Sequence, residues 1–285
     1  MKILIAGSEG MLGSDLVQEL GRAHQVLGLG RRQLDITNPG ECSERIAQFR
    51  PDVTVNAAGM TDVDGCETRQ EEAFRINGQG PGNLAAAAAR AGSMLVHYST
   101  DYVFDGAKPE PYREEDAPNP LSVYGKSKLR GDEMVRDLCP EHLILRTSWV
   151  FGKNGSNFIR TIAAAAREGR GLRVVHDQRG CPSYSLDLAI HTRMMLEAGC
   201  RGAYHLTNRG SCTWFELAVH IVRWLGLQEA SVTPVSTEEY HRAAPRPANS
   251  VLANARLERE GIPLMRPWQE AAQDYMDNHL SRRSF

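Results

Sequence analysis

Short, continuous hydrophobic runs alternate with amphipathic stretches through the first half of the chain. Runs without polar alternation are typical of strands buried on both faces, as in a parallel sheet. We expect such strands at residues 3–6, 26–29, 53–56, 94–98 and 143–146. The stretches between them repeat hydrophobic residues at helical spacing, which predicts helices at 12–20, 42–49, 71–90 and 122–138.

This alternation predicts an α/β fold, a doubly wound parallel sheet of the Rossmann type with helices on both faces. After residue 150 the regular alternation of hydrophobic runs and amphipathic stretches changes. Helices are expected at 158–167, 185–197, 214–225 and 268–280, short strands at 173–175 and 203–207, and a proline-rich loop at 244–248. We expect residues 1–150 to form an NAD(P)-binding domain, and residues 151–285 to form mainly a smaller substrate-binding lobe interleaved with the end of the sheet.

Composition narrows the class of protein. The 285 residues are 41% hydrophobic and 24% charged, which suits a folded domain with a core. The formal net charge of -2 creates no field that would attract nucleic acid or an anionic membrane. No run approaches the roughly 20 apolar residues of a membrane span, and no secretory signal is visible. We expect a cytoplasmic enzyme with a small-molecule ligand, without nucleic-acid or membrane partners.

The six cysteines include no C-x-x-C pair, so neither a zinc site nor a thioredoxin-like motif is indicated. A chain of this length does not need disulfides for stability. We expect reduced thiols and no metal.

A glycine-rich turn follows the first predicted strand and opens the first predicted helix. It reads Gly7-Ser8-Glu9-Gly10-Met11-Leu12-Gly13, with the spacing G-x-x-G-x-x-G. Such glycines allow a tight turn and let the backbone approach a pyrophosphate, while the helix N-terminus favours negative charge. A glycine-rich turn without a ligand is the structural alternative. The pattern favours a dinucleotide site formed by Gly7, Gly10, Met11, Leu12 and Gly13.

The residues after the next two strands bear on the choice of cofactor. Gly30-Arg31-Arg32 ends the second strand, where an acidic residue would bind the ribose of NAD and an arginine can bind the 2′-phosphate of NADP. Arg31 and Arg32 favour NADPH, with NADH as the alternative. Asp35 and Ile36 would flank the adenine, and the small residues Ala57, Ala58 and Gly59 would leave room for the cofactor.

A candidate catalytic group has the spacing Y-x-x-x-K. Tyr124 and Lys128 lie four residues apart, hence on one face of a helix. An ammonium near a phenol lowers the phenol's pKa, so Tyr124 would be a proton donor, and Lys128 would also hold a nicotinamide ribose. Thr100, or its neighbour Ser99, ends the fourth strand and would hydrogen-bond a substrate carbonyl. Alone, Y-x-x-x-K is a weak signal, and it gains weight from the glycine turn upstream.

Longer motifs add a family resemblance. Ser99-Thr100-Asp101-Tyr102-Val103-Phe104-Asp105-Gly106, the stretch 146–152, Asp177-Gln178 with Gly180 and Pro182, and Arg246-Pro247-Ala248-Asn249-Ser250 resemble the dTDP-4-dehydrorhamnose reductases, a family of extended short-chain dehydrogenases. The resemblance implies that NAD(P)H reduces the C4 ketone of a dTDP-activated keto-deoxysugar, with Tyr124 as the proton donor. It also implies a nucleotide-sugar site lined by Thr100, Asp101, Tyr102, Trp149 and Asn157, with Arg246 near the diphosphate.

The chain departs from the family pattern at a metal site. Some members form a dimer bridged by magnesium through acidic residues. Asp15 matches the first of these, but Leu186 and Ile190 stand at the later positions. We therefore expect no bridging metal, while a homodimer formed in another way stays open.

Three other functions stay open. One is another chemistry of the extended family, 4,6-dehydration or epimerisation; a dehydratase would carry glutamate after the Thr-Asp pair, whereas Tyr102 stands there. A non-catalytic NADP-binding regulatory subunit, similar to the methionine adenosyltransferase beta subunit, would not need Thr100, Tyr124 and Lys128 intact. A reductase of another nucleotide 4-keto-6-deoxysugar would need only small changes in the pocket.

Overall fold

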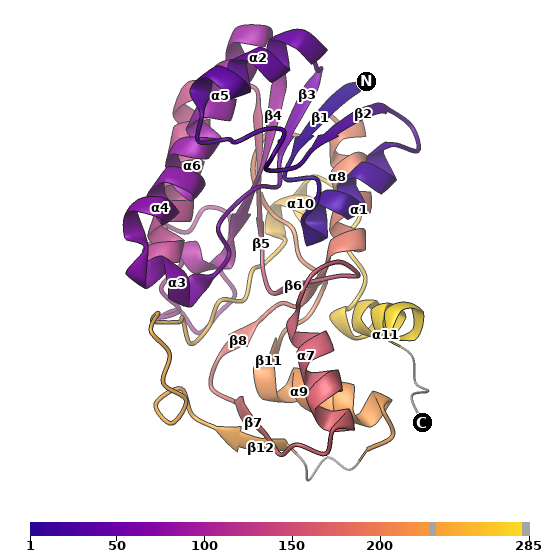
Figure 1. Ribbon diagram of the computed structural model, residues 1–285. Coiled ribbons are helices and arrows are strands. Elements are labelled where there is room, and N and C mark those ends of the chain that lie inside the picture. The colour runs from indigo at the N-terminus through magenta and orange to yellow at the C-terminus, as the bar shows by residue number, and fades with distance from the viewer. Residues whose placement is uncertain (228–231, 281–285) are drawn as a thin grey trace.

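A parallel sheet forms the centre of the molecule (Figure 1), which we describe from a computed structural model covering residues 1–227 and 232–280. Within this part of the chain the sheet has six strands in the order β2-β1-β3-β4-β5-β10. Their bounds are β1 (Lys2–Ala6), β2 (Gln25–Leu29), β3 (Val53–Asn56), β4 (Met94–Thr100), β5 (His142–Thr147) and β10 (Gly202–His205). The five strands expected in the first half are therefore confirmed, and the sixth comes from the second half.

Helices cover both faces of the sheet, as the continuous hydrophobic strands predicted (Figure 1). One face carries α2 (Pro39–Phe49), α5 (Gly80–Ala91) and α6 (Val123–Leu138), and the other carries α1 (Met11–Leu20) and α8 (Ser185–Glu197). Local sequence explains where α2 begins: Pro39 occupies its first turn, and the Asn38 side chain accepts hydrogen bonds from Gly40 N and Glu41 N.

The helix expected at 71–90 is continuous but changes its winding. It consists of α4 (Gln70–Phe74), a π-helical turn η1 (Arg75–Gln79) and α5. Wider turns of this kind are frequent at functional sites because they redirect side chains. Here the buried Asn77 exchanges hydrogen bonds with the Met60 backbone, its Oδ1 accepting from N at 2.8 Å and its Nδ2 donating to O at 3.0 Å. The preceding helix α3 (Val63–Thr68) was missed from the sequence.

The second half forms a smaller lobe below the sheet, with its own core around Phe151, Tyr184 and Tyr275 (Figure 1). The predicted helices appear as α7 (Phe158–Arg167), α9 (Trp214–Trp224) and α11 (Trp268–His279). The remaining elements are η2 (Asp101–Val103), α10 (Ala255–Arg259) and the strand pairs β6 (Val150–Phe151) with β9 (Ser183–Tyr184), β7 (Leu172–Val175) with β12 (Val232–Val235), and β8 (Arg179–Gly180) with β11 (Cys212–Thr213).

The lobe is interleaved with the sheet, as expected, because α8 and β10 return to the Rossmann body. The boundary at residue 150 stays a prediction, and residues 281–285 of the expected second lobe lie outside the described residues. In the described part of the chain, no helix combines the length and apolarity that a membrane crossing requires.

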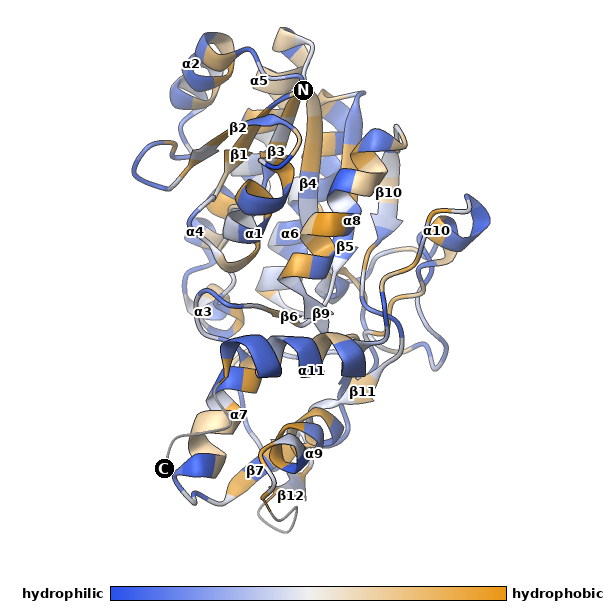
Figure 2. Cartoon of the chain, turned by 90° about the vertical axis from the view of Figure 1, so that its right-hand side faces the viewer, coloured by the Kyte–Doolittle hydropathy of each residue, from blue (hydrophilic) through white to orange (hydrophobic). Residues whose placement is uncertain are grey.

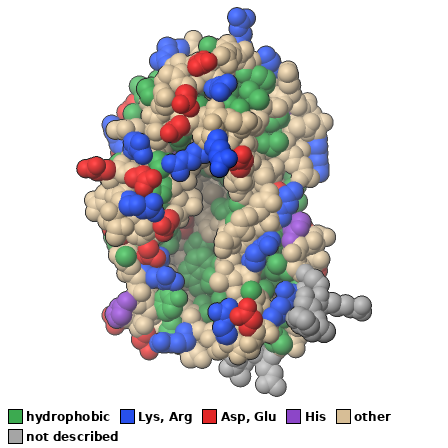
Figure 3. All heavy atoms as spheres, viewed as in Figure 1, with side chains coloured by type: hydrophobic (Ala, Val, Ile, Leu, Met, Phe, Trp, Pro, Cys, Tyr) green, Lys and Arg blue, Asp and Glu red, His purple; other side chains and the backbone are tan. Residues whose placement is uncertain are grey.

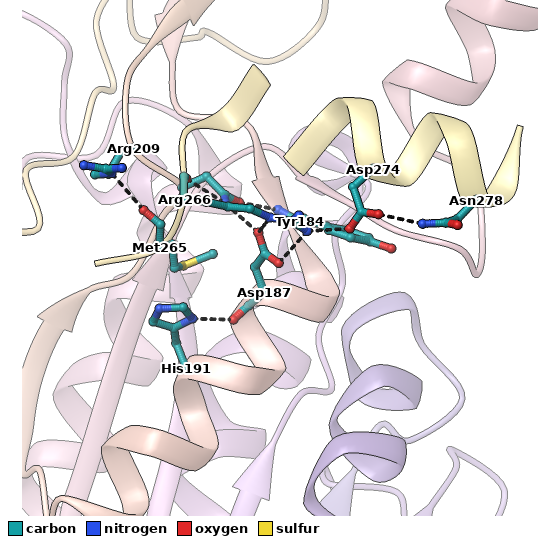
Figure 4. A network of polar contacts seen from close by, with 9 residues as sticks. Tyr184, Asp187, His191, Arg209, Met265, Arg266, Asp274 and Asn278 are labelled. Atoms are coloured by element: carbon teal, nitrogen blue, oxygen red, sulfur yellow. Dashed lines mark hydrogen bonds and ion pairs between the residues drawn. The ribbon is translucent and has the colours of Figure 1, made fainter. Parts of the chain in front are cut away.

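A polar network joins α11 to α8, and α11 crosses the molecule between the two bodies (Figures 2 and 4). Arg266 binds Asp187 at the start of α8 through two nitrogens, each 2.9 Å from a carboxylate oxygen, and Asp274 of α11 at 2.6 Å. Asp187 also accepts a hydrogen bond from Asn208 Nδ2 at 2.7 Å. Since Asp187 is buried, removing Arg266 would leave its charge poorly compensated.

Candidate functional site

The glycine turn lies where the strand order reverses, between β1 and β3. Ligands of open α/β sheets bind at this point. Gly7 has φ +80°, and a Cβ there would lie 2.6 Å from Ala58 N; a Cβ on Gly13 would lie 2.0 Å from Gly7 O. The turn must therefore be glycine at both positions. Gly10, which precedes α1, supplies no side-chain cap to the helix.

A cavity of about 440 Å³ extends from this turn over the end of β2. Of the residues expected to bind a cofactor, it is lined by Gly7, Gly10, Arg31, Asp35, Ile36, Ala57, Ala58 and Gly59. Arg32 does not line the cavity and is exposed, and Gly13 instead packs the turn. Arg75, at the start of the π-helical turn, also lines it and was missed from the sequence. The pKa of Asp35 is lowered, chiefly by the Thr37 backbone N–H and with help from Arg31 and Arg75.

A second cavity of about 460 Å³ shares Gly10 and residues 57–60 with the first. Figure 3 shows a hollow on this side of the molecule with hydrophobic side chains in its floor and basic side chains beside its upper end. Met11, Leu12, Thr100, Asp101, Tyr102, Tyr124, Lys128 and Trp149 all line the second cavity. The structure thus brings together most of the candidate residues from two distant parts of the sequence.

Tyr124 and Lys128 come from the first turns of α6, which begins at a cap formed by Ser122. Lys128 is buried, and its ammonium donates to Tyr98 O at 2.6 Å. Burial lowers the pKa of Lys128 to about 8, against the opposing effect of Asp132. Burial also raises the pKa of Tyr124, outweighing a hydrogen bond with Thr100 that lowers it. The pKa lowering that the spacing predicted for Tyr124 is therefore wrong for the structure described here, because desolvation of the phenol dominates.

The Thr100 hydroxyl group already donates a hydrogen bond to another residue of the protein. Its Oγ1 donates to Asp101 Oδ1 at 3.1 Å and accepts from Tyr102 N at 3.2 Å. Burial raises the pKa of Asp101 to about 6, although hydrogen bonds from Ser250, Ser148 and Thr100 oppose this. Ser99 also lines the cavity, and its buried hydroxyl has no hydrogen-bond partner among the described residues. A carbonyl oxygen in the cavity would satisfy such a hydroxyl.

Trp149 stacks on Trp214, with ring centroids 3.5 Å apart and an angle of 8° between the planes. Both rings line the second cavity. Trp149 has φ +46°, which is unusual for a residue with a large side chain. A Cβ on Gly180 would lie 2.4 Å from the Trp149 ring, so Gly180 provides the flat surface behind it. Trp214 was missed from the sequence because it lies 65 positions from its partner within a predicted helix.

Arg246 lies beside the catalytic group rather than in the open part of the cavity. Its guanidinium binds the Asp64 carboxylate through two nitrogens, at 3.0 and 2.9 Å, and hydrogen-bonds Tyr102. Tyr102 in turn packs edge to face on Tyr124, with ring centroids 5.8 Å apart. Asp64, on the α3 helix that the sequence did not predict, is the partner that sequence reasoning missed.

Asn157 is placed differently from the expected substrate contact. It does not line the second cavity, and it caps α7 by accepting from Arg160 N at 3.0 Å. Its Nδ2 donates to Gly152 O and Tyr275 Oη. Both the oxygen and the nitrogen of the Asn157 side-chain amide are therefore hydrogen-bonded within the protein.

No group of three or more histidine, cysteine, aspartate or glutamate side chains is arranged to hold a metal ion within residues 1–227 and 232–280. Asp15, the residue that matches the metal-bridged relatives, is buried, and its Oδ2 accepts from Ser185 Oγ at 2.5 Å. Leu186 and Ile190 follow on α8.

Comparisons with known proteins agree with this geometry. The family described as RmlD substrate binding domain matches residues 1–281. A dTDP-4-dehydrorhamnose reductase of Burkholderia thailandensis is 40% identical over 281 residues, covering 93% of this chain and 94% of the relative. A spore coat polysaccharide biosynthesis protein of Bacillus subtilis is also 40% identical, covering 98% of both chains. The structure of a dTDP-4-dehydrorhamnose reductase of Bacillus anthracis, in complex with NADP, is 36% identical with a TM-score of 0.94, over 97% of this chain and 99% of that one.

Proposed function

Because this chain belongs to the RmlD substrate binding domain family, we propose that it is an NADPH-dependent oxidoreductase that reduces the C4 ketone of dTDP-4-dehydro-L-rhamnose to dTDP-L-rhamnose. The relatives named as dTDP-4-dehydrorhamnose reductases support this assignment along nearly the whole chain. The observation that carries the proposal is the meeting of Tyr124, Lys128 and Thr100 in one cavity that continues into the glycine turn. Such a site serves the synthesis of nucleotide-sugar precursors of surface polysaccharides.

The glycine turn fits a dinucleotide. The close approach of Gly7, Gly13 and Ala58 leaves no room for Cβ atoms in the turn, so the backbone itself faces the cavity. Gly7, Gly10 and Ala58 would hold the pyrophosphate side of NADPH, and Lys128 would hold the nicotinamide ribose. When bound, NADPH supplies the hydride that reduces the ketone carbon.

The chain's own residues handle the ketone oxygen. Thr100 or Ser99 donates a hydrogen bond that polarises the carbonyl, for which Thr100 must release Asp101. Tyr124 then gives its phenolic proton to the alkoxide oxygen as negative charge develops there. The Lys128 ammonium stabilises the phenolate that is left, which offsets the desolvation that raises the pKa of the free phenol.

The rest of the cavity recognises the nucleotide sugar. Trp149 and Trp214 offer a fixed aromatic wall, and Tyr102 lies against the reacting phenol. Arg246 offers a planar fork for the diphosphate, which in the free protein is paired with Asp64. We no longer include Asn157 among these contacts, because its amide is committed to α7, Gly152 and Tyr275.

We propose NADPH as the preferred cofactor, with NADH as a weaker alternative. The solved relative in complex with NADP supports this choice, and so does Arg31 at the end of the first cavity. A cytoplasmic location is supported by the six cysteines, all within the described residues, buried and without disulfide bonds. A homodimer stays a proposal from the family resemblance.

The decisive experiment is NADPH oxidation with a panel of nucleotide 4-keto-6-deoxysugars, followed by identification of the product sugar. Stoichiometric oxidation with dTDP-4-dehydro-L-rhamnose and formation of dTDP-L-rhamnose are expected. A faster reaction with a different keto-sugar would replace the substrate, and cofactor recycling without net oxidation would indicate a dehydratase. Binding of NADPH without turnover of any keto-sugar would favour the regulatory-subunit alternative.

A further inference from the structure

A buried polar chain lies beside Lys128, formed by side chains that do not line the second cavity. Asp132 follows Lys128 by one helical turn and lies on the same buried face of α6. Its side chain is fully buried, and its Oδ2 accepts from Arg146 Nε of β5 at 3.3 Å. A fully buried carboxylate is costly unless it meets positive charge, and Arg146 supplies such a charge to one of its two oxygens.

The second oxygen of Asp132 faces a histidine whose tautomer is fixed by its neighbours. Asn56 accepts from Ala58 N through Oδ1 at 3.1 Å, so its Nδ2 must be the atom that faces His97 Nδ1 at 3.0 Å. His97 Nδ1 therefore accepts, and the ring proton resides on Nε2. That Nε2 lies 3.6 Å from Asp132 Oδ1, which is beyond hydrogen-bond distance, and neither atom has a hydrogen-bond partner among the described residues.

The imidazole in this chain is neutral. His97 is fully buried between β3 and α6, and its pKa lies well below the usual value because of burial and the nearby Lys128 charge. The chain therefore presents one polarised N–H to Asp132 and adds no second cation. Its other end is Ala58, which lines both cavities and closes on the glycine turn.

We propose that Asp132 is a positioning residue for the proposed catalytic lysine: its carboxylate keeps Lys128 an ammonium in a fully buried site, and the Asn56–His97 chain runs from beside that carboxylate to the cofactor loop. The inference rests on the role of Lys128 in the proposed function. Asp132 does not line the second cavity, so under this inference it would act on the reaction only through Lys128.

The electrostatics around Lys128 agree with this assignment. Lys128, Asp132 and Tyr124 are faced by titratable or charged groups from four other elements: His97 and Tyr98 from β4, Arg146 from β5, Asp101 and Tyr102 from η2, and Cys66 from α3. Among them, Asp132 opposes the effect of burial on the Lys128 pKa, which stands at about 8. Without that carboxylate the lysine would lose its proton at lower pH.

The test removes the negative charge of Asp132 and measures the pKa of Lys128 directly. In Asp132→Asn, the Lys128 pKa should fall by about 1 to 3 units, the range typical for loss of a close opposite charge. We would measure it by NMR titration of protein labelled with ¹³C at the lysine ε-carbon, with Lys128→Met to assign the signal. Because a lower pKa means that the ammonium is lost earlier as pH rises, the alkaline limb of the kcat profile should shift to lower pH by the same amount.

Matched variants separate this effect from a structural one. Asp132→Glu keeps the carboxylate and should keep the Lys128 pKa near the wild-type value. Glu19→Gln is the control, because Glu19 is also a buried carboxylate bound by arginines, Arg22 and Arg193, but on α1. It should reduce stability without moving the lysine signal. If Asp132→Asn does not fold, the double variant with Arg146→Met removes the stranded guanidinium, and its lysine pKa should lie below that of Arg146→Met alone.

An unchanged Lys128 pKa in Asp132→Asn, or in the double variant relative to Arg146→Met alone, would overturn the inference. The NMR readout needs neither cofactor nor turnover. A protein that reduces no keto-sugar but whose lysine signal shifts as expected would overturn the proposed function and support the electrostatic effect of Asp132 on Lys128.

Discussion

Two regions of the site are built in different ways. The proposed catalytic floor consists of Thr100, Tyr124 and Lys128, which lie on the last residue of a strand and the first turns of a helix. The recognition rim consists of Trp149, Trp214 and Arg246, which lie in the second half of the chain or at its border. Regular elements fix the floor locally, whereas the rim depends on contacts between distant segments: Arg246 meets Asp64 across 182 positions.

This difference between floor and rim corresponds to two proposed roles, the reaction itself and the recognition of the substrate. Thr100 and Lys128 are buried and Tyr124 is half-buried beside them, and burial shifts the pKa values of Tyr124 and Lys128 more than any other cause. Rim residues are half-buried and are held by stacking and by an ion pair. We therefore expect floor variants to reduce kcat and rim variants to raise KM.

The largest expected effect is on the floor. Tyr124→Phe keeps the ring that packs against Tyr102 but removes the proton donor. Turnover should fall by about 10²- to 10⁴-fold, the usual contribution of general acid catalysis. NADPH affinity, measured by fluorescence titration, should be unchanged, and stopped-flow hydride transfer would give the rate. A variant that turns over at the wild-type rate would refute the mechanism and make the regulatory-subunit reading the better one.

The next effect is on the rim. Arg246→Ala removes a two-nitrogen fork, and a charge-assisted hydrogen bond contributes roughly 1.5–3 kcal/mol, so KM for the nucleotide sugar should rise about tenfold to a hundredfold. Asp64→Asn should raise it less, because an amide oxygen can still orient one guanidinium nitrogen. Steady-state kinetics at saturating NADPH would check both. A fall in kcat with KM unchanged would break the distinction between floor and rim.

The same difference explains what could be predicted from the sequence. The grouping of the floor residues could be predicted from spacing alone. Residues four positions apart lie on the same face of a helix, and the carboxyl ends of parallel strands meet at one edge of the sheet. Trp214, Asp64 and Arg75 were missed because their roles depend on which distant residue they meet. Asn157 was predicted through family resemblance, but the turn into α7 uses its amide as a cap. The pKa of Tyr124 was predicted from one neighbour, while burial, which spacing does not reveal, has the larger effect.

A smaller effect concerns Arg31 and Arg32, two adjacent arginines for which the sequence predicts the same role in binding NADPH. Both side chains are exposed, but only Arg31 lines the first cavity. Arg31→Ala should therefore weaken NADPH at least about tenfold with little change for NADH, as expected for loss of a contact with a phosphate. Arg32→Ala is the matched control and should change neither affinity. Equal losses of NADPH and NADH affinity in Arg31→Ala would mean that this arginine does not read the 2′-phosphate.

The smallest expected effect is that of removing divalent metal. A family pattern alone would make Asp15 a magnesium ligand, but its carboxylate is buried, accepts from Ser185, and lies 3.8 Å from the Lys153 ammonium. A cation would have to displace that ammonium, and Leu186 and Ile190 would offer it no oxygen. Activity and assembly state, followed by NADPH oxidation and by light scattering, should be the same before and after dialysis against EDTA. Loss of either property in EDTA, with recovery on adding magnesium but not sodium, would reveal ligands outside this set. Because α1 and α8 lie against the same face of the sheet, such a result would also place a metal-dependent contact next to the glycine turn, and the separation of floor from rim would need a third region.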